Sequence, residues 1–279
     1  MSMSTHCMNP FELKQHHAGT LVPCGSCYNC KRRMVSSWSI RLINEGDHSH
    51  DSHFVTLTYN NDHLPLSKMG FQTLVKKDVQ DFMKRLRKAH PIDHKTIKYF
   101  AVGEYGGQTK RPHYHLILFN ANPLLIEIAW SLKDQAIGSI YVGLVSEASI
   151  GYCLKYISKI CYIGSDPKKD DRQKNFRLMS KGLGINYLTE KMKAWHKANP
   201  TERVYTPLKD GKKAPLSRYY KQKIYDELEK GKIALHFQNK ANILLEKLQK
   251  EHGDNFQLYL NDQYAHATQK MFKNKNSKL

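Results

Sequence analysis

The chain has 279 residues, of which 44 are Lys or Arg and 25 are Asp or Glu, so its formal net charge is +19. This length suits one large domain or a catalytic domain with appendages. Positive charge spread along the whole chain favours nucleic acid as partner over a merely solubilising surface, because such surfaces mix both signs at modest net charge.

Three further classes are disfavoured by what the sequence lacks. No stretch approaches the roughly 20 uninterrupted apolar residues of a membrane span, and the opening MSMSTHCMNPFELK lacks the apolar core of a signal peptide. No GxxxxGK[ST] loop is present, so an NTPase or helicase domain is not expected. We expect a soluble, intracellular protein with no membrane partner, whose cysteines are thiols or ligands rather than disulfides.

The predicted elements alternate between helices and strands, judged by apolar periodicity and by capping and turn residues. In chain order they are a helix at 30–46, a strand at 53–59, a basic amphipathic helix at 76–90, strands at 96–104 and 113–119, a helix at 122–133, a strand at 139–145, and a helix at 147–161 capped by Ser146.

This order predicts an α+β fold with a central antiparallel sheet of ferredoxin- or RRM-like βαββαβ order and helices on one face. A charged, turn-rich linker follows residue 163. We expect a Cys-rich segment and lead-in helix at 1–50, the sheet domain at 51–163, and a basic, mainly helical extension at 164–279 that ends in a disordered tail.

The stretch GEYGGQTKRPHYHLILF, residues 103–119, predicts a metal site. In a strand, residues i and i+2 share a face, so His113 and His115 project together while Tyr114 points the other way. If the two strands pair, Glu104 joins them as a carboxylate ligand. Such a set with open positions suits Mg²⁺ or Mn²⁺, with two imidazoles favouring Mn²⁺. The alternative is an ordinary polar face on a half-buried strand.

The helix GYCLKYISKIC, residues 151–161, carries candidate nucleophiles. At about 100° per residue, Tyr152, Lys155, Tyr156 and Lys159 fall in one narrow arc, opposite an aliphatic face. Tyrosines at the wet edge of a core are the alternative. Beside a metal set in a basic chain, however, two tyrosines one turn apart suggest phosphodiester chemistry, with Lys159 or Lys155 as the cation that holds developing charge.

The cysteines crowd the N-terminal region, and Cys7, Cys24, Cys27 and Cys30 form a candidate structural zinc site. Two C-x-x-C steps share Cys27, while Cys7 is remote. His6, His16 or His17 is an alternative fourth ligand, and free thiols are the alternative to any site. An iron–sulfur cluster of the radical-generating kind is disfavoured by the first spacing.

These residues resemble the HUH endonucleases, and most closely the rolling-circle replication initiators of gokushoviruses and related microviruses. FVTLTY resembles their first motif, GEYGGQTKRPHYHLILF their metal motif and YCLKYISK their two-tyrosine motif, and VPCGSCYNCKRR, RLMSKGLGINYL and LSRYYKQK are also similar to segments of these initiators. The resemblance covers roughly residues 20 to 225, and the motif order is specific.

The resemblance implies Glu104, His113 and His115 as metal ligands, Tyr152 and Tyr156 as nucleophiles, and Lys159 as the accompanying lysine. It implies a single-strand DNA endonuclease and strand transferase that works through a 5′-phosphotyrosine. Its partners would be single-stranded DNA, the origin of the phage replicative form, and host helicase and polymerase in the bacterial cytoplasm. Basic residues are expected to bind the DNA backbone: Lys84, Arg85, Arg87, Lys88, Lys110, Arg111 and Lys155.

Two alternative functions remain at this stage. One is a relaxase or transposase of the same superfamily. The other is an RRM-like nucleic-acid binder without catalysis, in which the sheet stacks bases and the histidine pair is incidental.

Overall fold

The structure is a computed structural model that describes residue 7, residues 9–12, 21–91 and 95–158, residues 163 and 166, and residues 168–276. The chain divides into two compact units: Arg41–Tyr187 forms one, and Met1–Ile40 with Leu188–Leu279 forms the other. Among the described residues, no helix is both long enough and apolar enough to cross a bilayer. The predicted boundaries at residues 50 and 163 stay a prediction.

The unit Arg41–Tyr187 is built on one antiparallel five-stranded sheet of order β8-β3-β5-β4-β9. Its strands are β3 Ser52–Thr58, β4 Lys98–Tyr105, β5 Pro112–Phe119, β8 Ile140–Leu144 and β9 Phe176–Met179. The helices between them are α2 Lys76–Ala89 and α3 Pro123–Ala129, and α4 Glu147–Ser158 follows β8. The chain order therefore confirms the predicted α+β sheet fold; β9 is an added edge strand that was not predicted.

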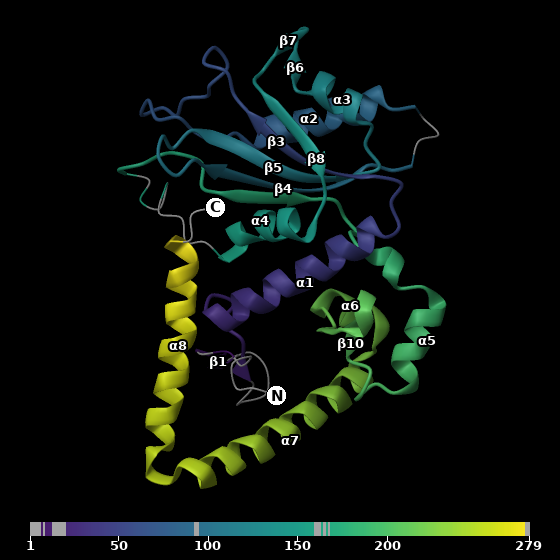
Figure 1. Ribbon diagram of the computed structural model, residues 1–279, viewed down its shortest axis with the longest axis vertical. Coiled ribbons are helices and arrows are strands. Elements are labelled where there is room, and N and C mark those ends of the chain that lie inside the picture. Colours follow the sequence, from purple (N-terminus) through teal and green to yellow (C-terminus); the bar gives the residue numbers. More distant parts are fainter. Residues whose placement is uncertain are drawn as a thin grey trace. The chain divides into compact units, whose positions relative to one another are not determined.

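The two faces of the sheet carry different helices. Helices α2 and α3 cover one face, and α4 lies on the other (Figure 1). Alternate residues of β5 point into the α2 side, where Tyr114, Leu116 and Leu118 join the core with Phe82 and Trp130. The residues between them, among them His113 and His115, therefore face α4. The face that holds α4 is where the predicted chemistry lies.

Helix α3 begins as predicted and ends earlier than predicted. Asn122 caps it by accepting a hydrogen bond from Leu124 N, but the helix stops at Ala129 rather than near residue 133. A small hairpin of β6 Ser131–Leu132 and β7 Gln135–Ala136 follows. Its turn residues Lys133 and Asp134 both have positive φ, 49° and 63°, which is the backbone of a two-residue hairpin turn.

The second unit is mainly helical, as predicted for the C-terminal extension. Its remaining elements, with those outside the large sheet, are β1 Phe11–Glu12, β2 Leu21–Val22, α1 Tyr28–Gly46, which continues into the first unit, η2 Ile185–Tyr187 of the first unit, α5 Glu190–Ala198, β10 Tyr205–Pro207, η3 Lys209–Gly211, β11 Lys213–Pro215, α6 Arg218–Ile224, α7 Glu227–His252, η4 Gly253–Asn255 and α8 Phe256–Asn276. Asp226 and Glu229 form a reciprocal capping box at the start of α7.

Candidate active site

Strand pairing brings the three predicted metal ligands together. Glu104 of β4 lies directly opposite His113 of β5, and His115 follows two residues later on the same face. Between them, Tyr114 points into the opposite face, where it is fully buried and its hydroxyl contacts that of Tyr59 at 2.6 Å. The buried tyrosine fixes the register of β5, and the register aims both imidazoles at one place.

The three side chains meet at a single carboxylate oxygen. Oε1 of Glu104 lies 2.9 Å from Nε2 of His113 and 3.0 Å from Nε2 of His115. Ligand atoms of all three residues lie within 4.8 Å of one another. Glu104 is only 2% exposed, and His115 only 5%. The arrangement is a compact, nearly buried set of two nitrogens and one carboxylate.

The other ring nitrogens show which atoms are available to a metal. Nδ1 of His113 donates to the carbonyl oxygen of Arg111 at 3.1 Å, because a carbonyl can only accept. Nδ1 of His115 contacts Oγ1 of Thr56 at 2.9 Å. In a neutral His113, Nε2 therefore carries a lone pair that faces Oε1 of Glu104. Two acceptors so close together need a proton or a cation between them, so the donor set fits a divalent ion.

The pKa shifts agree with this donor set. Burial alone would raise the pKa of Glu104, but the hydrogen bonds and charges of His113 and His115 outweigh it and hold the pKa below its ordinary value. Burial lowers the pKa of His115, and Glu104 offsets this only in part. At neutral pH the site therefore offers a carboxylate and a neutral imidazole, the forms that bind metal.

Helix α4 places both predicted tyrosines over this set. The ring of Tyr152 lies 4.8 Å from that of His115 by centroids, and the ring of Tyr156 stacks on His115 at 6.3 Å. The two tyrosine rings are 5.6 Å apart. The Tyr152 hydroxyl donates to Oε1 of Glu104 at 3.5 Å. The hydroxyl-bearing side chains and the carboxylate thus share one small volume.

Local sequence explains why α4 presents these rings. Ser146 and Ser149 cap its start reciprocally, Ser149 N donating to Oγ of Ser146 and Ser146 N to Oγ of Ser149. Leu154 and Cys153 are fully buried, so the helix is held by its apolar side. Burial raises the pKa of both Tyr152 and Tyr156, so each is a protonated phenol at neutral pH.

The predicted DNA-binding residues are not gathered in one place. Four of them, Lys84, Arg85, Arg87 and Lys88, lie on α2, across the sheet from the triad. Arg85 Nε donates to Ala129 O at 2.8 Å, and the Arg87 guanidinium lies over the Tyr99 ring at 5.5 Å. Both arginines therefore also support the fold, and a DNA-binding role for the α2 residues stays a prediction.

The other predicted basic residues belong to the site face or fall outside the described chain. Lys110 and Arg111 lie in the loop between β4 and β5, where the Arg111 guanidinium donates to Tyr59 O at 2.8 Å and to Asn61 Oδ1 at 3.0 Å. Lys155 is on α4. Lys159, the predicted accompanying lysine, lies outside the described residues.

Two site residues were not identified as such from the sequence. Thr56 of β3 pairs with His115 and holds its Nδ1, and the ring of Phe54 stacks on that of His115 at 5.7 Å with an interplanar angle of 7°. The signal was the alternation of FVTLT, which puts Phe54 and Thr56 on one face. It could be used only once β3 was known to lie beside β5.

The cysteines form a second cluster, in the unit that lacks the sheet. The sulfur atoms of Cys7, Cys24, Cys27 and Cys30 lie within 4.8 Å of one another. The hydroxyl of Ser26, with backbone hydrogen bonds, lowers the pKa of the Cys24 thiol to about 5, whereas burial raises that of Cys7 to about 11. The predicted four-cysteine set is thus brought together spatially.

The fold and the site define a class of domain: an antiparallel sheet whose central strand carries a candidate metal triad facing two tyrosines of one helix. Comparison with known proteins gives the same class a family. Residues 52–161, which hold the triad and both tyrosines, match the family model described as replication-associated protein ORF2. This part of the chain belongs to that family, and the resemblance to microvirus replication proteins is confirmed.

Three curated relatives extend the similarity beyond this domain. The chain is 25% identical over 246 residues to replication-associated protein VP4 of Bdellovibrio phage phiMH2K, an alignment that covers 77% of this chain and 76% of the relative. It is 31% identical to replication-associated protein ORF2 of Spiroplasma virus 4, over 63% of this chain and 60% of the relative. It is 26% identical to replication-associated protein ORF4 of Chlamydia phage 1, over 72% of this chain and 52% of the relative. No solved structure matches the chain significantly.

Proposed function

We propose that the protein initiates rolling-circle replication of a small phage genome by nicking and rejoining single-stranded DNA. Tyr152 or Tyr156 attacks a phosphodiester at the origin of the double-stranded replicative form, and the same chemistry later closes the displaced single-stranded circle. The names of the three relatives support the replication role. The chemistry is argued from the site.

One observation carries the proposal: two phenols from one helix lie against a triad of one carboxylate and two imidazoles. The Tyr152 hydroxyl is 3.5 Å from Oε1 of Glu104, and both tyrosine rings contact the ring of His115. A phosphate seated on the triad would therefore be within reach of a tyrosine oxygen. An incidental histidine pair on a polar strand has no need of such partners.

The triad would hold Mg²⁺ or Mn²⁺, to which phosphate oxygens add further ligands. When bound, the ion makes the scissile phosphorus more electrophilic and offsets charge on its oxygens. Glu104 and the histidines fix its position, and Thr56 and the Arg111 carbonyl fix the ring orientations. Burial of the triad excludes bulk water that would otherwise weaken these electrostatic interactions.

The tyrosine supplies the nucleophile and keeps the energy of the broken bond. Its phenolic oxygen forms a bond to phosphorus, the bond from phosphorus to the 3′ oxygen of the preceding nucleotide breaks, and that oxygen leaves as a 3′-hydroxyl after taking up a proton. The phenol must give up its own proton, and for Tyr152 an acceptor oxygen of Glu104 is already adjacent. Lys155 or Lys159 would hold the charge that develops on the phosphate.

Two tyrosines allow two such exchanges without release of the DNA. While one tyrosine carries the 5′ end as a phosphotyrosine ester, the other can cleave at the regenerated origin, and the free 3′-hydroxyl then attacks the first ester to close a circle. Strand separation and synthesis between the two events would be the work of host helicase and polymerase in the bacterial cytoplasm. The basic residues listed above would track the DNA backbone.

The direct test is covalent capture. The full-length protein is incubated with overlapping single-stranded fragments of the genome that encodes it, with Mn²⁺ present, and adducts that survive denaturation are resolved by gel electrophoresis. We expect one fragment to give an adduct whose modified peptide contains Tyr152 or Tyr156. The double variant Tyr152→Phe with Tyr156→Phe should give none, and an adduct with that variant would refute the assignment.

A matched tyrosine elsewhere serves as control. Tyr259 of α8 stacks its ring on His252 at 4.0 Å, a contact that phenylalanine retains. Tyr259→Phe should form the adduct as the wild type does. The binder without catalysis is tested in the same experiment by adding a chelator: a binder would hold the fragment equally well with and without metal and never cut it. Rejoining on circular against linear flanked substrates separates an initiator from a relaxase or transposase.

A further inference from the structure

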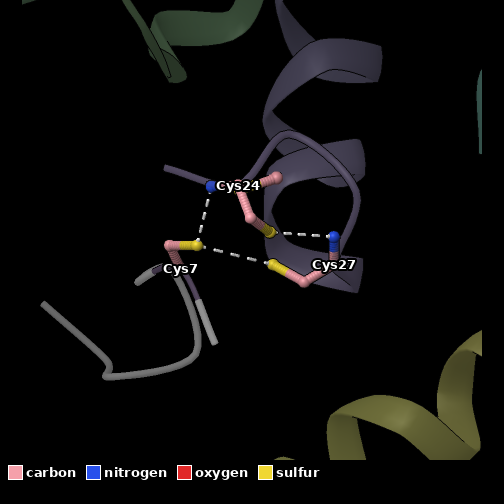
Figure 2. Close-up of side chains that lie close together, drawn as sticks. Cys7, Cys24 and Cys27 are labelled. Atoms are coloured by element: carbon pink, nitrogen blue, oxygen red, sulfur yellow. Dashed lines mark hydrogen bonds between the residues drawn. The ribbon is translucent and has the colours of Figure 1, made fainter. Parts of the chain in front are cut away.

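A second candidate metal centre lies in the unit that lacks the large sheet. Cys7, Cys24 and Cys27 converge, with Sγ of Cys27 4.0 Å from Sγ of Cys7, and Cys30 completes the set within 4.8 Å (Figure 2). Cys30 is almost fully buried, and the other three are partly buried. Four sulfurs this close and not joined as disulfides need a reason to be together.

A short hairpin explains how the remote cysteine arrives. Strands β1 and β2 pair antiparallel, with Phe11 opposite Val22 and Glu12 opposite Leu21. In this register each step back from Phe11 matches a step forward from Val22, so Cys7 is carried toward the turn that holds Cys24 and Cys27. The backbone N–H of Cys24 donates to Sγ of Cys7 at 3.2 Å.

The turn between Cys24 and Cys27 has the backbone needed to present both sulfurs to one point. Gly25 has a φ of 72°, in the left-handed region that favours glycine. This conformation lets the N–H of Cys27 donate to Sγ of Cys24 at 3.3 Å (Figure 2). Such N–H donors are stronger toward a thiolate than toward a thiol, because the acceptor then carries a charge.

Cys30 is presented by the first turn of α1, which begins at Tyr28. The start of a helix carries partial positive charge and favours a thiolate. The guanidinium of Arg33, one turn further along, donates to Sγ of Cys30 at 3.2 Å. Positive charge is therefore placed beside this sulfur, as a negatively charged metal–thiolate centre would require.

We propose that Cys7, Cys24, Cys27 and Cys30 bind one zinc ion as a closed structural site. A zinc–sulfur bond of about 2.3 Å in a tetrahedron puts the sulfurs about 3.8 Å apart, close to the 4.0 Å between Cys7 and Cys27. A four-iron cluster would need the sulfurs further apart, because irons and bridging sulfides stand between them. Four protein ligands leave no open position, so the site does not activate water or substrate.

The site would fasten the N-terminal strand pair to α1. The chain between Cys7 and Cys24 is closed into a loop, and its ends are tied to the first turn of the helix that continues into the other unit. Without the metal, only the two-residue strands β1 and β2 hold that loop among the described residues. The inference does not depend on the proposed nicking activity, since the two ligand sets share no residue.

The test measures metal and thiols in the full-length protein. A His113→Ala with His115→Ala background removes metal bound at the triad, so that any remaining zinc reports on the cysteines. We expect about one zinc per chain after gel filtration, released in step with modification of four thiols by a mercurial reagent. Replacement by Co²⁺ should give the intense sulfur-to-metal absorption of tetrahedral thiolate coordination.

Single substitutions identify the ligands. Cys24→Ser and Cys30→Ser should each lose most of the zinc and the cobalt–thiolate bands, whereas Cys153→Ser, which alters a buried thiol of the sheet unit, should keep both. The wild-type zinc and thiol count decides the question even if a variant fails to fold. A metal-free chain with reactive thiols, a disulfide within the set, or the brown colour and iron content of a cluster would each overturn the proposal.

Discussion

Glu104 and His113 are direct partners across the pairing of β4 with β5, and their side chains meet with Oε1 of Glu104 2.9 Å from Nε2 of His113. The pair contributes an anionic and a neutral ligand from neighbouring strands, so strand pairing alone sets the ligand spacing. The rigidity of a sheet interior then keeps that spacing when substrate enters and leaves.

Glu104→Gln keeps the size of this side chain and removes its charge. We expect nicking of single-stranded DNA to slow by at least about 100-fold, because loss of partners behind a ligand alone costs 10- to 100-fold in many metal sites. The rate is measured with labelled DNA at several Mn²⁺ concentrations. If the variant cuts at the wild-type rate with the same metal dependence, Glu104 is not a ligand.

Thr56→Val tests the support of a ligand rather than the ligand. Oγ1 of Thr56 lies 2.9 Å from Nδ1 of His115, so its removal frees the ring to turn. We expect Mn²⁺ affinity, measured by calorimetry, to fall by about 10- to 100-fold while the fold is kept. Thr58→Val is the matched control, since the Thr58 hydroxyl donates to Ser139 O instead. Equal losses in both variants would argue against the contact.

Gly138 lies where a side chain has no room. An added Cβ would stand 2.0 Å from the carbonyl oxygen of Thr58, which is backbone and cannot turn away. That same oxygen accepts the indole N–H of Trp130 at 2.8 Å. Gly138→Ala should therefore lower the free energy of unfolding by about 3 kcal/mol or more, measured by chemical denaturation.

Gly151 of α4 supplies the contrast for this substitution. An added Cβ there meets nothing within 4 Å, and the position is helical. Gly151→Ala should raise the free energy of unfolding by about 0.5 to 1 kcal/mol through helix propensity. If Gly138→Ala is as stable as Gly151→Ala, the close approach to Thr58 does not exist in solution.

His196 predicts a loss of stability in acid. It is fully buried in α5, and burial lowers its pKa from the ordinary value of 6.5, although its Nδ1–H donates to Arg203 O at 2.7 Å. The unfolded chain then binds more protons than the folded chain, so this contribution to stability is complete above pH 6.5 and is lost as pH falls through the folded pKa.

The measurement compares unfolding midpoints of the wild type and His196→Gln from neutral pH down through this window. The glutamine amide can still donate to Arg203 O and does not titrate, so the variant should lose less stability in acid. His266→Gln, at an exposed position of α8, should follow the wild type. Parallel curves for wild type and His196→Gln would contradict the prediction.

The sequence predicted those parts of the site that local periodicity determines. His113 and His115 share a face because a strand repeats every two residues, and Glu104 joins them because a hairpin pairs neighbouring strands. Tyr152 and Tyr156 are one helical turn apart for the same kind of reason. Each of these relationships spans only a few residues or one connecting loop.

What the sequence did not reveal depends on non-local contacts or on unusual backbone. Thr56 supports His115 only because β3 pairs with β5 across 59 positions of chain. Strand β9 is four residues long and follows a charged segment, so it has no periodic pattern to detect. The hairpin after α3 needs positive φ at Lys133, a residue that gives no hint of it.

The opposed faces of β5 restrict how this protein can vary. Tyr114 is anchored in the core while its neighbours on either side reach the triad. Inserting or deleting a single residue within the strand would exchange those roles, turning both imidazoles into the apolar interior. Length changes among relatives should therefore be confined to the connection at 106–111, and an alignment that gaps the strand itself would mark a chain that has abandoned the metal.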